Sequence, residues 1–155
     1  MLNITLVAIG PLKADYCQSA WTEYVKRLKP YARLRLVELA PASFSKTSQA
    51  KAKEMESQRL EDFLVEATKK EQRPVYLLAE RGRSFTSPEL ADWFGRNQSI
   101  ILVIGGALGF SPRLYGLYPQ ISLSPLTFPH ELARVLLLEQ LYRSVTILNK
   151  KEYHY

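Results

Sequence analysis

The sequence predicts an α/β fold in which helices cover both faces of a mostly parallel sheet. Segments with strand patterns alternate with segments with helix patterns along the chain, as in folds built from strand–helix–strand units. The predicted strands are mostly continuous apolar runs, which is typical of strands buried on both faces. The 155 residues are 46% hydrophobic and include one cysteine, so we expect a single domain over residues 1–155 that needs no disulfide or metal.

A buried strand and an amphipathic helix are predicted at the start of the chain. Residues 3–9 are almost all apolar or β-branched, and a Gly-Pro pair closes the run. Apolar residues then recur at helical spacing from Cys17 up to Pro30, with Asp15 in position to cap the helix. We therefore expect Cys17 to lie in the core.

A second strand and a long helix follow. Residues 33–39 alternate, which predicts a strand but leaves its buried face undecided. Residues 40–48 are polar and rich in turn formers, so we expect a mobile loop there. Residues 49–71 have the pattern of a charged helix. Its inward-facing side chains are expected to be Met55, Leu60, Phe63, Leu64 and Ala67.

Two further strands with a short helix between them are predicted in the middle of the chain. Residues 74–79 form an apolar strand, and the polar residues 80–83 should form a loop. Ser87 is placed to cap a short helix that has Pro88 at its first position. Residues 99–104 are again continuously apolar, which predicts a fourth strand.

The last third of the chain ends in an unusually apolar helix. Ser111 should cap a short helix, residues 120–123 should form a last strand, and residues 130–148 should form the final helix. Because apolar side chains nearly surround that final helix, it must be covered on more than one side. We favour a homodimer through this helix, and the alternative is central burial within one chain.

Three loops should meet where a ligand binds, because parallel sheets bind ligands at the carboxyl ends of their strands. They follow Ala79, Ile104 and Leu123. The glycine turn at residues 105–109 allows a ligand to approach bare backbone, although a plain strand-to-helix turn explains it as well. The proline loop at residues 124–129 would offer backbone groups to an adenine edge, and a plain connection is its alternative.

The net charge of +6 favours an anionic partner such as nucleic acid. No stretch has the length of a membrane span and the N-terminus lacks signal-peptide features, so we expect a cytoplasmic protein with no membrane partner. No Cys/His cluster has zinc-ligand spacing, so no metal is expected. Candidates for RNA docking are Lys13, Lys26, Arg27, Lys29, Arg81, Arg83, Lys150 and Lys151.

Four segments, in their order and spacing, resemble one known family. They are Ile-Gly-Gly-x-x-Gly at 104–109, Leu-Ser-x-Leu-Thr-Phe-Pro-His at 123–130, Arg-Val-Leu-Leu-x-Glu-Gln-Leu-Tyr-Arg at 134–143 and Tyr-His at 153–154. Together they resemble the RlmH (YbeA) family of SPOUT-class methyltransferases over essentially the whole chain. Members of that family methylate N3 of a pseudouridine in large-subunit (23S) ribosomal RNA.

The resemblance implies a SPOUT-type α/β fold with a C-terminal trefoil knot, a homodimer and S-adenosyl-L-methionine as cofactor. Neither composition nor periodicity predicts a knot. We expect the RNA to be recognised in the large subunit or the 70S ribosome, because so small a protein carries no separate RNA-binding domain. The implied cofactor contacts are Leu78, Gly106, Ser124, Pro125, Leu126, Thr127, Phe128 and Pro129.

The resemblance also implies a catalytic group near the end of the chain. Methyl transfer to N3 needs alignment of the nucleophile and removal of a proton. His154 and Glu139 are the candidate bases, and Arg143 would hold a phosphate or stabilise a developing anion. His130 would either take part in the chemistry or orient the proline loop.

Two other functions fit parts of the sequence. One is a non-catalytic RNA-binding or ribosome-binding module of the same fold, and the other is a nucleotide-binding enzyme suggested by the glycine turn. Two positions also depart from the family pattern: Pro11 stands where lysine is often found, and Tyr155 follows His154 where a basic residue is expected. Tyr155 offers stacking on a base in place of a phosphate contact.

Overall fold

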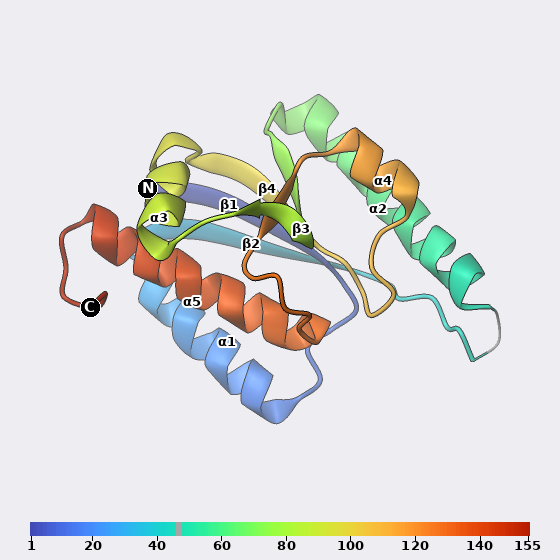
Figure 1. Cartoon of the computed structure of the whole chain (residues 1–155), viewed down its shortest axis with the longest axis horizontal. Helices are drawn as coiled ribbons and strands as arrows, with labels where there is room; N and C mark the ends of the chain where they lie inside the picture. The colour runs from blue at the N-terminus through green and yellow to red at the C-terminus, as the bar shows by residue number, and fades with distance from the viewer. Residues whose placement is uncertain (46–47) are drawn as a thin grey trace.

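The computed structural model describes residues 1–45 and 48–155. The elements in chain order are β1 (Leu2–Ile9), α1 (Asp15–Leu28), β2 (Ala32–Leu39), α2 (Gln49–Glu71), β3 (Val75–Ser84), α3 (Ser87–Arg96), β4 (Ser99–Ile104), α4 (Pro112–Leu117), β5 (Gln120–Ser122) and α5 (His130–Leu148). The strands form one sheet with the order β2-β1-β4-β3-β5, and each neighbouring pair is parallel (Figure 1). The predicted α/β class and parallel sheet are confirmed.

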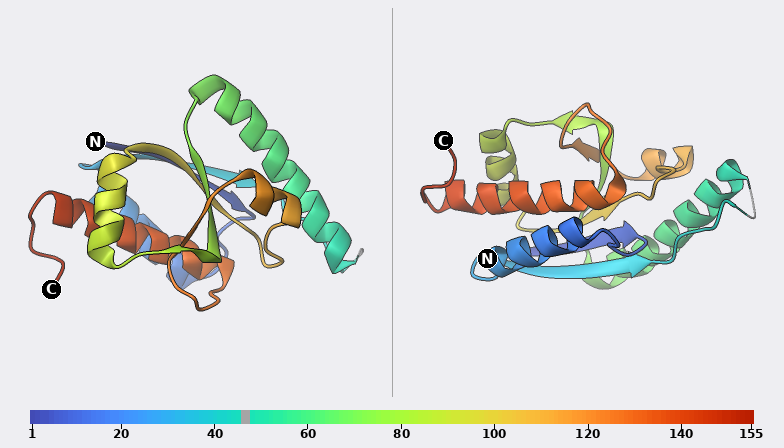
Figure 2. Two further views of the ribbon diagram at one scale, coloured as in Figure 1. Left: turned by 45° about the horizontal axis from the view of Figure 1, so that its top comes forward. Right: turned by 90° about the horizontal axis from the view of Figure 1, so that it is seen from below.

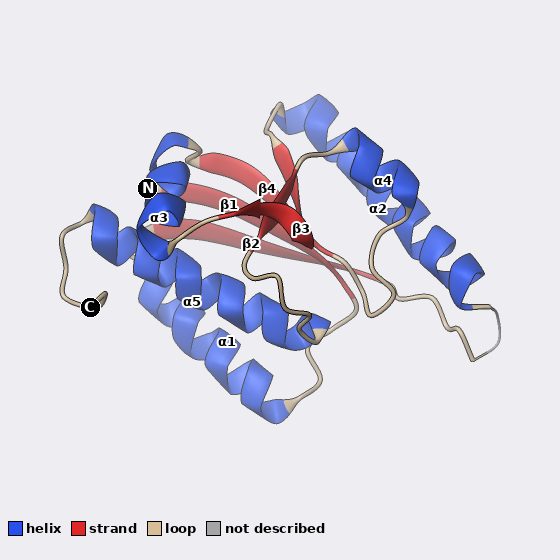
Figure 3. Cartoon of the chain, in the orientation of Figure 1, coloured by secondary structure: helices blue, strands red, loops and turns tan. Residues whose placement is uncertain are grey.

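Helices cover both faces of the sheet, as the apolar strands predict. Successive strand residues point to opposite faces. On β1, Ile4 and Leu6 belong to an apolar cluster with α1, α3 and α5, whereas Val7 and Ile9 belong to a second cluster with α2 and α4. The views agree that α1 lies beside α5, with α2 and α4 apart from them (Figures 2 and 3).

The final helix is the central helix of its layer. α5 packs against α1, α3 and β4, and Leu137, Leu138 and Leu141 are each 1% exposed. Most of the apolar surface of α5 is therefore covered within the chain, which agrees with the alternative of central burial within one chain. Leu148, near its end, remains 41% exposed. This packing does not test the predicted homodimer.

The first residue of α3 was predicted one position late. Thr86, not Ser87, is the N-cap, because its hydroxyl accepts from Glu89 N while the Glu89 carboxylate accepts from Thr86 N at 2.7 Å. This reciprocal pair is a capping box, which places Pro88 at the second helical position. The Ser87-Pro88 pair suggested Ser87 as the N-cap. The carboxylate of Glu89, three residues after Thr86, makes Thr86 the N-cap instead.

The expected Asp15 cap of α1 is also wrong. Ala14 is the N-cap and has no side chain to accept a hydrogen bond. Glu131 of α5 supplies the acceptor instead: it accepts from Ala14 N at 3.0 Å and from Lys13 N. Local sequence could not predict this cap, because its acceptor is 117 residues away. Cys17 on the same helix is fully buried, as predicted.

α2 has the predicted limits, but one inward residue was wrong. Met55 is 41% exposed, and the buried face instead runs through Ala52, Glu56, Leu60 and Leu64 at a spacing of four residues. The preference for apolar residues suggested Met55, while the helical phase places Glu56 inside. Partly buried on the inner side are Phe63 and Ala67.

β3 is longer than predicted and includes the expected loop 80–83. Its first half pairs with β4, and Arg83 and Ser84 pair with Ile121 and Ser122 of β5 after a register shift. A Cβ on Gly82 would lie 2.6 Å from the backbone carbon of Ile121, so only glycine permits this close crossing. The second half of β3 was not predicted because its side chains are polar. It is held by backbone pairing with β5 and not by apolar burial.

The described part of the chain contains no helix long and apolar enough to cross a membrane. Among the same residues, no group of three or more His, Cys, Asp and Glu side chains is arranged to hold a metal ion. Residues 46 and 47 of the predicted mobile loop 40–48 lie outside the described range, and the mobility of that loop stays a prediction.

Candidate functional site

A cavity of about 710 Å³ lies at the carboxyl end of the sheet. Its wall comes from residues 78–80 of β3, residues 104–110 after β4, and residues of the segment 123–130 between β5 and α5. Tyr115 of α4 and Ala133 of α5 complete the wall. The three loops predicted to meet at this edge therefore do so.

Seven of the eight implied cofactor contacts line this cavity. They are Leu78, Gly106, Ser124, Leu126, Thr127, Phe128 and Pro129. Pro125 does not contribute to the wall. Leu126 N donates to Ser124 Oγ at 3.0 Å, which closes a turn that contains Pro125. His130, the first residue of α5, lines the cavity beside the proline loop.

Hydrogen bonds hold the proline loop on the sheet. Ser122 Oγ lies 3.0 Å from the carbonyl oxygen of Glu80 and 2.9 Å from that of Ser124. One hydroxyl thus links the end of β5 to both β3 and the loop. The loop is therefore positioned by its own chain, which lowers the entropic cost of ordering it around a ligand.

Gly106 brings the glycine turn against two buried neighbours. A Cβ at Gly106 would lie 2.8 Å from Glu56 Oε2 and 3.1 Å from Ile9 Cγ2. The turn is closed by Gly109, which has a φ of +75° and donates from its N–H to the Gly106 carbonyl at 3.1 Å. Gly106 is predicted to contact a cofactor on the side that faces the cavity. On the opposite side, packing against Glu56 and Ile9 also requires glycine.

A buried arginine that sequence reasoning missed fixes the start of α5. Arg134 is fully buried, pairs with Glu38 of β2 at 2.9 Å and donates to the carbonyl oxygens of Ile9 and Gly10. Since Ile9 touches the glycine turn, Arg134 connects α5 to the back of the cavity. Arginine in an otherwise apolar stretch was the available signal, because a buried guanidinium must be paired.

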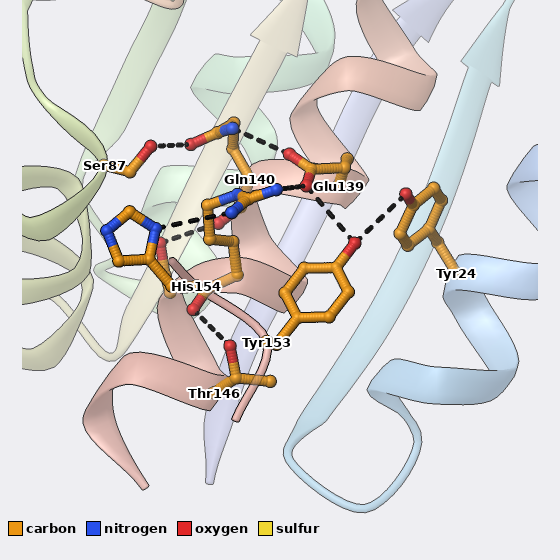
Figure 4. Close-up of polar contacts among 9 residues, drawn as sticks. Tyr24, Ser87, Glu139, Gln140, Thr146, Tyr153 and His154 are labelled. Carbon is orange, nitrogen blue, oxygen red and sulfur yellow. Dashed lines mark hydrogen bonds and ion pairs between the residues drawn. The ribbon is translucent and has the colours of Figure 1, made fainter. Parts of the chain in front are cut away.

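The three predicted catalytic residues gather at the other end of α5. Arg143 Nη2 donates to Glu139 Oε1 at 2.6 Å, and Arg143 Nη1 lies 3.3 Å from His154 Nδ1. Tyr153 Oη donates to Glu139 Oε1 at 3.3 Å, and Gln140 Nε2 donates to Glu139 Oε2 at 2.7 Å (Figure 4). We call Tyr24, Glu139, Gln140, Arg143, Tyr153 and His154 the C-terminal cluster.

Protonation in the C-terminal cluster follows from these contacts. The hydrogen bond from Arg143 to Glu139 raises the pKa of the guanidinium, which stays charged. Burial and the contact with Tyr24 raise the pKa of Tyr153, so this phenol stays neutral. A guanidinium can only donate, so in its contact with Arg143 the His154 Nδ1 atom is the acceptor.

The cavity and the C-terminal cluster are far apart within one chain. His130 begins α5 at the cavity, and Glu139 and Arg143 follow nine and thirteen residues later. At 1.5 Å per helical residue they lie about 13 and 20 Å along the axis from His130, and about 9 and 15 Å from Ala133, which also lines the cavity. The two groups of residues therefore occupy separate stretches of α5 within one chain.

Basic and aromatic side chains surround the C-terminal cluster. The Arg27 guanidinium lies 5.8 Å from the centre of the Tyr24 ring and 5.7 Å from that of Tyr142. The Lys151 ammonium lies 4.9 Å from the centre of the Tyr31 ring. Such pairs suit stacked bases and phosphates. The role of these and the other basic candidates in RNA docking stays a prediction.

Comparisons with known proteins agree with this geometry. A family model described as "Predicted SPOUT methyltransferase" matches residues 2–154. A protein of Gloeobacter violaceus named "Ribosomal RNA large subunit methyltransferase H" is 41% identical over 99% of both chains. A protein of the same name from Acetivibrio thermocellus is 37% identical, again over 99% of both chains.

A solved structure described as "Structural insights into the 2-OH methylation of C/U34 on tRNA" shares the fold. The match has a TM-score of 0.50 at 14% sequence identity, and it covers 97% of this chain and 99% of the chain in that structure. The family model and the full-length relatives together go beyond the fold. The chain belongs to the SPOUT methyltransferase family, in the group of proteins named ribosomal RNA large subunit methyltransferase H.

Proposed function

We propose that this chain uses S-adenosyl-L-methionine to methylate N3 of a pseudouridine in large-subunit (23S) ribosomal RNA. The observation that carries the proposal is the cavity of about 710 Å³, around which the segments implied to hold the cofactor meet. The names of the relatives support large-subunit ribosomal RNA as the substrate. The proposed substrate form is the assembled large subunit or 70S ribosome, and the proposed location is the cytoplasm.

The cavity suits the cofactor in size and chemistry. Pockets for small molecules measure about 300–1,000 Å³ and are mostly apolar with a few polar groups. Here apolar side chains and the bare backbone of Gly106 form most of the wall. The bound cofactor would supply a methyl group on a positively charged sulfur. The residues proposed to hold it are Leu78, Gly106, Ser124, Pro125, Leu126, Thr127, Phe128 and Pro129.

Arg143 and His154 are proposed to act on the nucleotide. The Arg143 guanidinium would stabilise the negative charge that develops as N3 loses its proton. His154 is the proposed proton acceptor, through the Nδ1 atom that becomes free when Arg143 turns to the RNA. Both oxygens of Glu139 are engaged by neighbouring donors, so we assign it the positioning of Arg143.

The proposed working unit is a homodimer in which one chain supplies the cavity and its partner supplies the C-terminal cluster. The separation of about 9–20 Å along α5 between the residues that line the cavity and those of the C-terminal cluster supports this arrangement. Exposed apolar side chains near the two regions also support it: Tyr16 is 69% exposed, Leu126 68% and Leu148 41%. A second copy would cover such side chains.

Each chain is proposed to be a single domain over residues 1–155 with a C-terminal trefoil knot. The pairing of β3 with both β4 and β5 supports a chain crossing in this region. The close approach of Gly82 to Ile121 supports it as well.

Mass-spectrometric mapping of ribosomal RNA from cells with and without the gene tests the proposed function. We expect one methyl group to be missing from a large-subunit pseudouridine in the cells without it. Identical RNA in both would contradict the proposal. If the chain is instead a non-catalytic RNA-binding module, its affinity for RNA should not depend on the cofactor and should be unchanged in His154→Ala.

A further inference from the structure

Glu56 of α2 is a buried carboxylate with one engaged and one free oxygen. It is 4% exposed, and its Oε1 accepts from Ala42 N at 3.1 Å. Its Oε2 is fully buried and has no hydrogen-bond partner among the described residues. A buried polar oxygen without a partner costs free energy, so it points to an interaction that the contacts within the chain do not supply.

The free oxygen lies directly behind the cavity. Glu56 Oε2 is 2.8 Å from the point that a Cβ of Gly106 would occupy. Gly106 is itself part of the cavity wall, so the carboxylate lies against the outer side of the glycine turn that forms this wall. Ala42, which donates to the other oxygen, holds the carboxylate in this place.

The residues that line the cavity have a charge balance opposite to that of the whole chain, and the buried guanidinium of Arg134 behind the cavity is already paired with Glu38. The chain has a net charge of +6, but no lysine or arginine is among the described residues that line the cavity. Glu80 is an acidic residue in the wall, and Glu56 lies behind it. A carboxylate next to a space with little water attracts a cation more strongly than it would in bulk solvent.

We propose that Glu56 is a specificity-determining residue that favours a positively charged ligand in the cavity. The inference rests on the proposed function and deepens it. When the methyl group is transferred, the electron pair of the broken carbon–sulfur bond stays on sulfur, and the ligand loses one positive charge. Glu56 therefore stabilises the sulfonium donor more than the neutral thioether product, which helps product to be replaced by new donor.

Calorimetry on the purified full-length chain tests this inference without a turnover assay. Three ligands are compared: S-adenosylmethionine, its neutral product S-adenosylhomocysteine, and sinefungin, an unreactive analogue with an ammonium in place of the sulfonium. Glu56→Gln keeps an acceptor for Ala42 N and removes the charge. We expect the affinity for both cationic ligands to fall about tenfold relative to the affinity for the product.

Two variants serve as controls. Glu54→Gln removes the same charge from an exposed position of α2 and should leave all three affinities unchanged. Glu80→Gln, at an exposed position of the cavity wall, should shift the preference in the same direction as Glu56→Gln but by less. It also keeps the inference testable if Glu56→Gln does not fold.

The outcomes separate this inference from the proposed function. A selective loss of the two cationic ligands supports it. An equal loss of all three ligands in Glu56→Gln means that the residue only shapes the turn, and it overturns the inference. An unchanged preference in Glu56→Gln also overturns it, whatever Glu80→Gln shows. If Glu56→Gln does not fold, an unchanged preference in Glu80→Gln overturns it instead. If the unaltered chain binds none of the three ligands, the proposed function itself fails.

Discussion

The two ends of α5 differ in what holds them in place. At the cavity end, Arg134 is fully buried and bonds to backbone carbonyls, and glycines allow close backbone contacts. At the other end, Arg143 and His154 are partly or largely exposed and are held by other side chains. The cavity is thus part of the folded core, whereas the side-chain contacts of the C-terminal cluster are of a kind that the proposed RNA substrate would be able to replace.

This difference predicts how the two ends respond to mutation. Changes at the cavity end should act on the folded state, because the packing there is shared with the sheet. Changes in the C-terminal cluster should act on the reaction and leave the fold intact. One helix carries both ends, so matched substitutions on α5 make the comparison direct.

The largest effect on stability is expected from Arg134→Met. It leaves Glu38 and two carbonyl oxygens without their donor, so the free energy of unfolding should fall by about 3 kcal/mol. Arg143→Met makes the same change in the C-terminal cluster and should lower it by less than about 1 kcal/mol. Urea unfolding followed by circular dichroism measures both. Equal losses would contradict the distinction between the two ends.

The rate of methyl transfer should respond mainly to changes in the C-terminal cluster. Arg143→Ala should reduce the rate of methyl transfer about a hundredfold, because the charge that stabilises the developing anion is lost. Its affinity for the cofactor should not change, since Arg143 does not line the cavity. Single-turnover rates on purified ribosomal subunits and calorimetry measure the two quantities. A loss of cofactor affinity in this variant would contradict the assignment.

A smaller loss of stability is expected from Gly82→Ala. The added methyl group would meet the backbone of β5 at 2.6–2.8 Å, and relieving that contact should cost about 2 kcal/mol. Gly116→Ala is the matched control, since nothing lies within 4 Å of a Cβ at that position of α4. The control should be neutral or slightly stabilising in thermal unfolding. A neutral Gly82→Ala would show that β3 and β5 separate easily.

The smallest effect is expected from Tyr153 at alkaline pH. Its folded-state pKa is raised above the ordinary value of 10.0, first by burial and then by its contact with Tyr24. Above pH 10.0 the unfolded chain releases this proton while the folded chain keeps it, so the free energy of unfolding falls as the pH rises. Tyr153→Phe should therefore lose less stability than the unaltered chain between about pH 10 and 11. Parallel curves in urea titrations would contradict this.

The local patterns of the sequence predicted most of the fold and most of the cavity wall. Continuous apolar runs are enough to predict parallel strands, because both faces of such a sheet are covered. Glycine and proline likewise marked the turns that shape the cavity. The second half of β3 escaped prediction, since its polar residues are held by backbone pairing with β5.

The features that were missed depend on partners distant in sequence. The acceptor at the start of α1 is Glu131, and the partners of Arg134 are Glu38 and the end of β1. Glu56 was missed because its inward position follows from the phase of α2 and not from its residue type. No local pattern contains such pairs, although a buried arginine or glutamate signals that a partner must exist.

The most direct test of the composite site is complementation between two inactive variants. Gly106→Val should displace the glycine turn that forms part of the cavity wall, because its side chain would clash with Glu56 and Ile9 behind the turn, and His154→Ala should remove the proposed proton acceptor. If each site combines a cavity from one chain with the C-terminal cluster of its partner, equal mixing and reassembly restores about a quarter of the unaltered methylation rate, because half of the dimers then hold one intact site. A mixture as inactive as its two components would contradict a site shared between chains.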